Sequence, residues 1–164
     1  MLQKIKKSRV NKKNRAKNIT NVLVAIADDK YGASVTDFIA NYQWPAKTRL
    51  LLLYVLEEHS IRSVMRFSPQ LAEQIVENDE EYGQDLLARS EKRLKRKLPN
   101  TKIESCLIRG SAKDEILENA NRIKADIIVL GAHGRTGIGS LLLGSVSMAV
   151  ATHASCSVVI VRTS

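Results

Sequence analysis

The sequence alternates between runs of consecutive apolar residues and segments in which apolar residues recur every three or four positions. The apolar runs, together with one segment of alternating character, predict strands over residues 21–27, 49–58, 101–109, 126–130 and 157–162. The three- and four-residue spacing predicts helices over residues 32–42, 69–98, 112–123 and 144–153. Strands and helices are therefore expected to alternate along almost the whole chain.

Several of the predicted strands are apolar on both faces, as in residues 50–56. Such strands are typical of a parallel sheet with helices on both faces. The fold class we expect is α/β, an open five-stranded parallel sheet of Rossmann-like form. Sheets of this kind bind ligands at the carboxyl ends of their strands, where the strand order reverses. The expected site therefore lies near residues 27–30, 55–57 and 131–145.

Nearly all of the excess positive charge lies at the start of the chain. The 164 residues have a formal net charge of +9, but residues 1–17 hold eight Lys or Arg and no acid, which leaves 18 basic and 17 acidic residues elsewhere. We expect residues 1–18 to form a basic tail and residues 19–164 to form one domain. Such a tail is typically a solvated arm. Its charge would also suit the phosphates of nucleic acid or an anionic membrane, although no aromatic residue accompanies the charges for base stacking.

No segment has the pattern of a signal peptide or a membrane span. The basic N-terminus is not followed by an apolar stretch, and the longest apolar run is far shorter than the roughly 20 residues that a bilayer requires. The two cysteines, Cys106 and Cys156, lie in strand-like stretches and are expected to be buried free thiols. We expect a cytoplasmic protein.

The segment GAHGRTGIGSLLLGS, residues 131–145, joins a predicted strand to a predicted helix. Glycines let the backbone approach an anion closely, and successive N–H groups followed by a helix N-terminus form a phosphate site. The amides of residues 134–140 and 145–146 are candidate donors, and Arg135 can reach a phosphate. The segment is not a P-loop, because Ser140 and Leu141 stand where that motif has lysine and a hydroxyl residue. The order of its glycines also differs from the dinucleotide fingerprint G-x-G-x-x-G.

The spacing of Gly131, Gly134 and Gly144-Ser145, written G-x2-G-x9-G-S, resembles the nucleotide-binding signature of the universal stress protein family. The resemblance extends over residues 20–163 and includes VLVAIA, LLLYVLEE, ADIIVLGAHGRTG and LLLGSVSMAVATHASCSVVIVR. It implies a five-stranded parallel sheet of the adenine-nucleotide α-hydrolase type. The retained glycines imply the ATP-binding branch of the family, with Mg²⁺ accompanying ATP.

The resemblance also implies which residues of this chain contact the nucleotide. They are Gly131, His133 and Gly134 for ribose and phosphate; Gly144, Ser145 and Val146 for the triphosphate; Ala25 and Val55 for adenine; and Leu130 immediately before the first glycine.

One position departs from the family pattern. The family usually has an aspartate at the end of the first strand, where this chain has Ala27 followed by Asp28 and Asp29. Asp28 takes the place of that aspartate if the strand end shifts by one residue; otherwise a polar contact to the base or ribose is missing. Its loss would weaken base selection, because a site built to hydrogen-bond a group rejects analogues that lack it.

Other polar residues near the expected site have structural interpretations. Ser145 is expected to cap a helix and bind phosphate, because no nucleophile motif surrounds it. His153 is expected at a helix end, and Glu57 and Glu58 at a solvated strand end. His59 has no further ligand at a suitable spacing, so no metal site is expected.

The last predicted strand, residues 157–162, would expose an apolar edge unless another strand pairs with it. The resemblance implies a homodimer through this strand; a sheet order that buries it internally is the alternative. Together these features predict an ATP-binding sensor or signalling module in the stress response. No motif positions a general base, so efficient hydrolysis is not expected, while slow ATPase activity or self-phosphorylation stays open. A nucleotide-using enzyme of the same superfamily and a nucleotide-free interaction module are the alternative functions.

Overall fold

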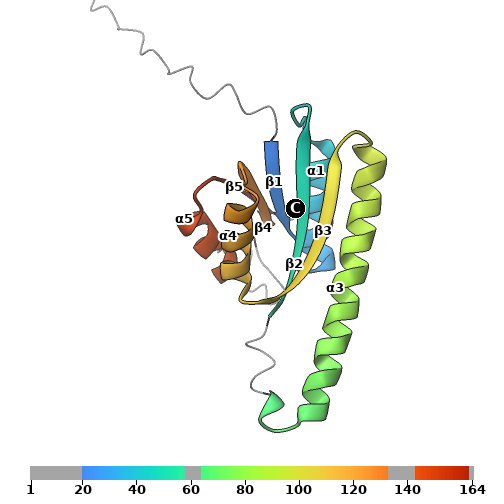
Figure 1. Ribbon diagram of the computed structural model, residues 1–164, viewed down its shortest axis with the longest axis vertical. Coiled ribbons are helices and arrows are strands. Elements are labelled where there is room, and N and C mark those ends of the chain that lie inside the picture. The colour runs from blue at the N-terminus through green and yellow to red at the C-terminus, as the bar shows by residue number, and fades with distance from the viewer. Residues whose placement is uncertain (1–19, 58–63, 133–142, 163–164) are drawn as a thin grey trace, which may run out of the picture.

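The computed structural model describes residues 20–57, 64–132 and 143–162 (Figure 1). Its strands are β1 (Thr20–Ala25), β2 (Thr48–Glu57), β3 (Lys102–Gly110), β4 (Ile127–Gly131) and β5 (Ser157–Val161). Its helices are α1 (Asp29–Asn41), α3 (Pro69–Lys97), α4 (Ala112–Arg122) and α5 (Ser145–His153). Every strand and helix that the sequence pattern predicts is present, in the predicted order.

The five strands form one parallel sheet with the order β3-β2-β1-β4-β5. The chain moves across the sheet from β1 to β3 and then returns to place β4 on the other side of β1. The strand order therefore reverses between β1 and β4, where Val24 pairs with Val129. β5 lies at the edge of the sheet, which excludes the alternative that buries this strand internally. The predicted α/β fold class is confirmed.

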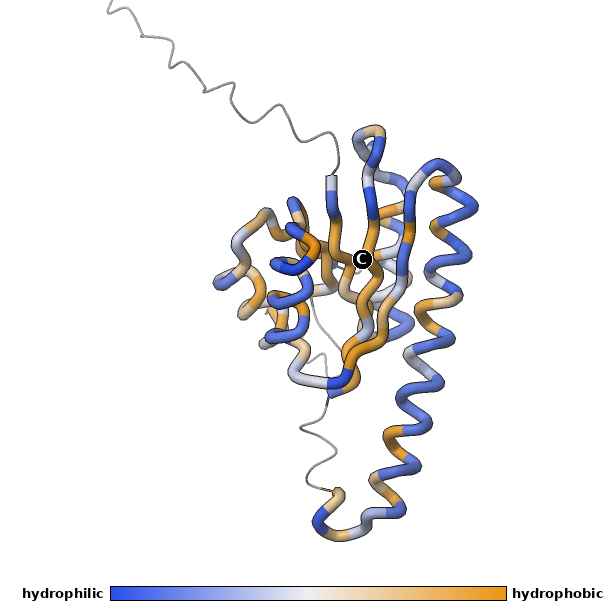
Figure 2. Tube along the Cα trace, viewed as in Figure 1, coloured by the Kyte–Doolittle hydropathy of each residue, from blue (hydrophilic) through white to orange (hydrophobic). Residues whose placement is uncertain are grey.

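The helices cover the two faces of the sheet in pairs. Side chains alternate along β1, so Val22 and Val24 join one core while Leu23 joins the other. α1 and α3 cover the first face, with Ile39 in the core, and α4 and α5 cover the second, with Val150 in the core. Figure 2 shows the resulting pattern, in which hydrophobic residues follow the strands and α3 is largely hydrophilic.

Two element boundaries near the expected site differ from the prediction. β1 ends two residues earlier than predicted, and α1 begins three residues earlier. The helix begins early because the Asp28 carboxylate accepts a hydrogen bond of 2.7 Å from the Tyr31 backbone N–H and so serves as its N-cap. Gly32 consequently lies inside the helix, where an added Cβ would come within 2.7 Å of the Ile26 side chain.

α3 packs closely on the sheet at Gly83. A Cβ at this position would come within 2.5 Å of the Tyr54 ring, which is fully buried. The Tyr54 hydroxyl donates a hydrogen bond of 2.8 Å to the Asp79 carboxylate, and burial raises the pKa of Asp79. The first turns of α3 extend past the sheet (Figure 1), and the side chain of Phe67 just before them is 90% exposed. Ala72 and Val76 in these turns still pack with Leu56 near the end of β2, so α3 contacts the sheet along most of its length.

Neither cysteine is as buried as expected. Cys106 and Cys156 are free thiols, but both are only half-buried. The prediction of buried thiols is wrong because Cys106 lies on β3 and Cys156 precedes β5, and these are the two edge strands. Burial still raises the pKa of Cys156, and the charge of Asp126 raises it further. Among the helices of the described segments, none is long and apolar enough to cross a membrane.

Candidate functional site

A cavity of about 330 Å³ lies at the carboxyl ends of β1, β2 and β4, where the strand order reverses. The structure brings eight of the predicted nucleotide contacts together in its wall. They are Ala25, Ala27, Val55, Leu130, Gly131, Gly144, Ser145 and Val146. These residues come from four separate parts of the sequence, and most of them present apolar or backbone groups to the cavity.

The described residues of the cavity wall do not include the other four predicted nucleotide contacts. His133, Gly134 and Arg135 lie outside the described residues. Asp28 is not part of the cavity wall, because its Oδ1 caps α1 as described above. Its second oxygen, Oδ2, is buried and has no hydrogen-bond partner among the described residues. Leaving a buried acceptor without a hydrogen bond costs about 1–3 kcal/mol of folding free energy. Asp28 therefore has an acceptor oxygen beside Ala27 that could still gain a hydrogen bond.

Hydrogen bonds hold the two ends of the glycine segment together. The Gly144 N–H donates to the Ala132 carbonyl at 2.8 Å. The Ser147 hydroxyl lies 2.8 Å from the Gly131 carbonyl and 3.1 Å from that of Ala132. The Ala132 N–H in turn donates to the Val161 carbonyl of β5 at 2.8 Å. These bonds fix the cavity wall where β4 ends and α5 begins. Ser147 was not identified as a site residue from the sequence, because a single serine inside a helix matches no motif.

The start of α5 differs from the prediction. Gly144 is the N-cap, with φ −63° and ψ 157°, and no side chain caps the helix. The expectation that Ser145 caps α5 is therefore wrong: Ser145 is the first helical residue, and its exposed side chain lies at the cavity. The first N–H groups of a helix have no carbonyl partner within it. The N–H groups of Ser145 and Val146 are thus available as donors in the cavity wall.

Glu57, the last residue of β2, is not at a solvated strand end, so that prediction is wrong. Glu57 lines the cavity, and its Oε1 accepts a hydrogen bond of 3.1 Å from the N–H of Ala112, the first residue of α4. The N-cap of α4, Ser111, makes no capping side-chain hydrogen bond, so Glu57 caps this helix from a neighbouring strand. Glu58 lies outside the described residues. Glu57 lies within residues 55–57, which were expected near the site from the sequence, and this position was the only sequence feature that could have indicated its place in the cavity wall.

Three helices contribute first-turn residues to the cavity wall, and carboxylates lie at the starts of two of them. α1 begins after the Asp28 cap with Asp29 in its first turn, and α4 begins against Glu57 with Asp114 and Glu115 in its first turn. α5 has neither an acidic residue in its first turn nor a side-chain cap. Because a helix N-terminus carries partial positive charge, the α5 end of the cavity favours an anion. The end at Glu57 favours hydrogen-bond donors.

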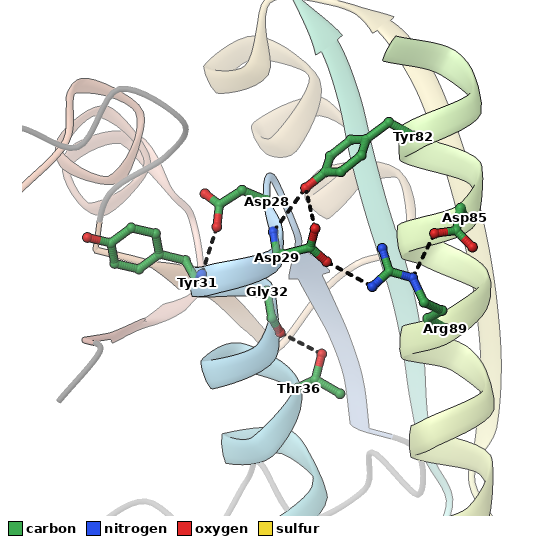
Figure 3. A network of polar contacts seen from close by, with 8 residues as sticks. All are labelled: Asp28, Asp29, Tyr31, Gly32, Thr36, Tyr82, Asp85 and Arg89. Atoms are coloured by element: carbon green, nitrogen blue, oxygen red, sulfur yellow. Dashed lines mark hydrogen bonds and ion pairs between the residues drawn. The ribbon is translucent and has the colours of Figure 1, made fainter. Parts of the chain in front are cut away.

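α3 fixes the start of α1 through a network of polar contacts (Figure 3). The Tyr82 hydroxyl accepts a hydrogen bond of 3.0 Å from the Asp29 N–H and donates one of 3.1 Å to the Asp29 carboxylate. Arg89 binds Asp29 at 2.9 Å and Asp85 at 2.7 Å. Burial, followed by the hydrogen bond and charge of Asp29, raises the pKa of Tyr82. The network holds the first turn of α1, which carries Tyr31 in the cavity wall.

Within the three described segments, no group of three or more His, Cys, Asp or Glu residues could hold a metal ion. His153 is the last residue of α5, as predicted, and its Nδ1 lies 2.8 Å from the Ala149 carbonyl. His59 lies outside the described residues. The described part of the cavity wall offers backbone donors, the Glu57 carboxylate and apolar side chains.

A model of the universal stress protein family matches residues 18–162. The chain belongs to the universal stress protein family. The match confirms the resemblance inferred from the glycine spacing, and it includes every described strand and helix. The universal stress protein domain of this chain therefore contains the whole cavity.

Individual members of the family show the same fold. Universal stress protein MJ0577 of Methanocaldococcus jannaschii is 28% identical over 123 residues, which cover 69% of this chain and 76% of that protein. The structure of MJ0577 has a TM-score of 0.71 at 22% identity and covers 90% of this chain and 98% of that chain. The universal stress protein from Archaeoglobus fulgidus in complex with dAMP has a TM-score of 0.61 at 17% identity, with coverage of 88% and 98%. The protein At3g01520 from Arabidopsis thaliana, with AMP bound, has a TM-score of 0.60 at 20% identity, with coverage of 88% and 92%.

Some relatives match over only part of their length. The alignments with four other universal stress proteins cover between 29% and 43% of those proteins.

Proposed function

We propose that this universal stress protein binds an adenine nucleotide, specifically ATP, in the cavity, and acts as a nucleotide-dependent sensor or signalling module in the stress response. The polarity of the cavity carries the proposal: an apolar wall lies between a carboxylate-free helix N-terminus and the Glu57 carboxylate. The groups of a nucleotide match these three parts of the cavity: its phosphates suit the helix N-terminus, its ring system suits the apolar wall, and its N–H and O–H donors suit the carboxylate. The volume of about 330 Å³ falls within the roughly 300–1,000 Å³ typical of small-molecule sites.

The ligands of two structural relatives support an adenine nucleotide. The Archaeoglobus fulgidus protein is in complex with dAMP, and At3g01520 has AMP bound. Both ligands combine adenine with a phosphate, so a site that suits both groups is expected in a protein of the same fold. ATP adds two phosphates, and the G-x2-G-x9-G-S spacing provides backbone donors for them.

In this proposal the phosphates bind at the start of α5. The N–H groups of Ser145 and Val146 and the Ser145 hydroxyl are the donors, and Gly144 has no side chain to separate them from the ligand. His133, Gly134 and Arg135 would add the remaining phosphate and ribose contacts that the family pattern implies. The carboxylates at the starts of α1 and α4 repel phosphates, which fixes the direction of the nucleotide.

Adenine would lie against the apolar part of the wall formed by Ala25, Val55 and Leu130. The unpartnered Oδ2 of Asp28 is then the acceptor that takes the place of the family aspartate, because Ala27 offers only backbone groups. A shift that brings Oδ2 to an N–H or O–H of the base or ribose would satisfy a buried acceptor as the ligand binds.

Mg²⁺ would accompany ATP and would be held by phosphate oxygens and water. The described residues provide no carboxylate at the α5 end of the cavity, whereas Mg²⁺ prefers oxygen ligands and often keeps several waters in nucleotide complexes. When bound, the ion would neutralise part of the phosphate charge. The proposed role requires nucleotide binding and does not require turnover.

Calorimetric titration with ATP and Mg²⁺ tests this function, with Gly144→Val as the disabling variant. The φ of −63° at Gly144 is one that valine adopts, so the variant is expected to fold, but its branched side chain would stand between the α5 amides and a phosphate. We expect ATP affinity to fall at least about tenfold, the loss of one or more charge-assisted hydrogen bonds. Ala151→Val, on the exposed side of the same helix, is the matched control.

Two results would overturn the proposal. One is an unmodified chain that does not bind ATP, and the other is a folded Gly144→Val chain that binds ATP as well as the control. Rapid multiple-turnover release of ADP or pyrophosphate would instead favour the nucleotide-using enzyme.

The edge strand β5 supports a homodimer as a second part of the proposal. The Ser157 N–H donates to the Asp126 carbonyl and the Val161 carbonyl accepts from Ala132, so these backbone groups face β4. Because backbone direction alternates along a strand, the N–H and C=O groups of Val158 and Ile160 face the open edge. The edge strand of a second copy would satisfy them and cover the half-buried apolar side chains of β5.

Val158→Pro tests the dimer, because it removes an outward-facing N–H while leaving the β4 ladder intact. We expect the chain to sediment as a dimer and the proline variant as a monomer, while Val158→Thr remains dimeric. A folded proline variant that stays dimeric would place the interface elsewhere.

A further inference from the structure

Among the described residues that line the cavity, Glu57 is the one acidic residue. It ends β2, two positions beyond the apolar Val55 that also lines the cavity. The backbone N–H of Ala112 holds it in place through Oε1 at 3.1 Å. A carboxylate has about four positions at which it accepts hydrogen bonds, and this contact uses one of them. The group that remains for a ligand at this end is therefore an acceptor with negative charge.

The contact with Ala112 also gives Glu57 a role that needs no ligand. Ser111 makes no capping side-chain hydrogen bond at the start of α4, and the Glu57 carboxylate supplies the missing acceptor at this helix N-terminus. A glutamine would keep this role, because its amide oxygen accepts the same hydrogen bond. Its second group, however, would be an NH₂ donor in place of an acceptor oxygen. The two roles can therefore be separated by one substitution.

We propose that Glu57 determines ligand specificity by accepting a hydrogen bond from an N–H or O–H donor of the bound nucleotide. This inference rests on the proposed nucleotide binding. Two donors of a nucleotide fit this chemistry, the exocyclic amine of adenine and a ribose hydroxyl. In inosine triphosphate a carbonyl replaces the amine, so two hydrogen-bond acceptors would face each other. In 2′-deoxy-ATP one hydroxyl is absent, so the Glu57 carboxylate would have no donor there.

Calorimetric affinities for ATP, inosine triphosphate and 2′-deoxy-ATP test the inference and separate the two donors. The unmodified chain should prefer ATP to at least one analogue by about tenfold, the value of one hydrogen bond to a charged group. Glu57→Gln should remove that preference, and if the amine is the donor it should bind inosine triphosphate better than ATP. Asp114→Asn makes the same charge change in the exposed first turn of α4, outside the cavity wall, and should leave the ratios unchanged.

Three outcomes decide the matter. A change in either affinity ratio in Glu57→Gln but not in Asp114→Asn supports the inference and identifies the donor. Unchanged ratios in a Glu57→Gln chain that still binds ATP overturn it and leave the proposed function standing. An unmodified chain that binds none of the three nucleotides overturns both. If Glu57→Gln does not fold, Glu57→Asp, which keeps the charge but shortens its reach, must change the same ratio.

Discussion

The hydroxyl of Ser147, in the first turn of α5, donates a hydrogen bond of 2.8 Å to the carbonyl of Gly131, the last residue of β4. This bond joins two of the segments that the family resemblance implies as nucleotide contacts. Ser147 is buried, so water cannot replace the interaction. The distance between the end of β4 and the start of α5 is therefore set before any ligand binds.

Removal of this hydroxyl should weaken nucleotide binding, and steric blocking cannot be the cause, because alanine is smaller than serine. In Ser147→Ala the Gly131 carbonyl loses this buried hydrogen bond, and we expect the free energy of unfolding to fall by about 1–2 kcal/mol. We also expect ATP affinity to fall by about fivefold to tenfold, because the cavity wall is less fixed. Denaturant unfolding and calorimetry measure the two effects. Thr152→Ala, an exposed hydroxyl on the same helix, should change neither.

A carboxylate at the start of α5 should stabilise the fold and weaken nucleotide binding at the same time. In Ser145→Asp the new charge interacts favourably with the helix N-terminus, and we expect about 0.3–1 kcal/mol of added stability. The same charge repels a phosphate at the α5 amides, so ATP affinity should fall by about tenfold or more. Thermal unfolding without ligand should show the higher stability, and calorimetry with ATP should show the lower affinity.

Ser111→Asp is the matched control for that experiment. It places a carboxylate at the N-cap of α4, where Ser111 makes no capping hydrogen bond of its own and lies outside the cavity wall. It should stabilise the chain with little effect on ATP. Equal losses of affinity in the two variants would argue against a phosphate at α5.

Much of this structure follows from local patterns in the sequence. The apolar periodicity predicts the five strands and the helices α1, α3, α4 and α5, because side-chain burial repeats with the period of the element. The parallel sheet follows from strands that are apolar on both faces, and its carboxyl edge locates the cavity. Asp28 was readable as an N-cap in principle, since aspartate before a helical segment is a preferred cap.

The contacts that shape the site could not be read in the same way. Glu57 caps a helix that begins 55 residues later in the chain, and Ser147 bonds a carbonyl 16 residues earlier. Nothing in the residues around either side chain indicates its partner, because both contacts form only when separate elements pack. The error for Glu57 is typical: a charged residue at a strand end is usually solvated, and here the start of α4 lies over it.

The Tyr82 contacts predict a pH dependence of stability. Because its folded-state pKa is raised above the ordinary value near 10, folding favours the neutral phenol. The stability that Tyr82 adds is complete below about pH 10 and is lost as the pH rises through the raised pKa. Tyr82→Phe should therefore be less stable by about 0.5–1.5 kcal/mol near neutral pH, and the gap should narrow under alkaline conditions. Urea unfolding of both chains at a series of pH values measures this difference in unfolding free energy. A difference that grows as the pH rises would contradict the prediction.

Gly83 should resist a substitution that normally favours helices. Replacing glycine by alanine inside a helix usually adds about 1 kcal/mol of stability. Here the new Cβ would come within 2.5 Å of the buried Tyr54 ring, so we expect Gly83→Ala to destabilise the chain by about 1–3 kcal/mol instead. Gln84→Ala, at the next and exposed position, should stay within about 0.5 kcal/mol of the unmodified chain in the same denaturant titration. A more stable Gly83→Ala chain would contradict the close packing.

The position of the nucleotide is tested most directly by recording ¹H–¹⁵N NMR spectra of the chain during titration with ATP. If the nucleotide spans the cavity from Glu57 to α5, saturable shifts should appear together in the amides of Val55, Glu57, Gly131, Ser145 and Val146. Residues on the outer side of α3 should change little. Shifts confined to the basic residues 1–17, or the absence of saturable shifts around the cavity, would contradict nucleotide binding at this site.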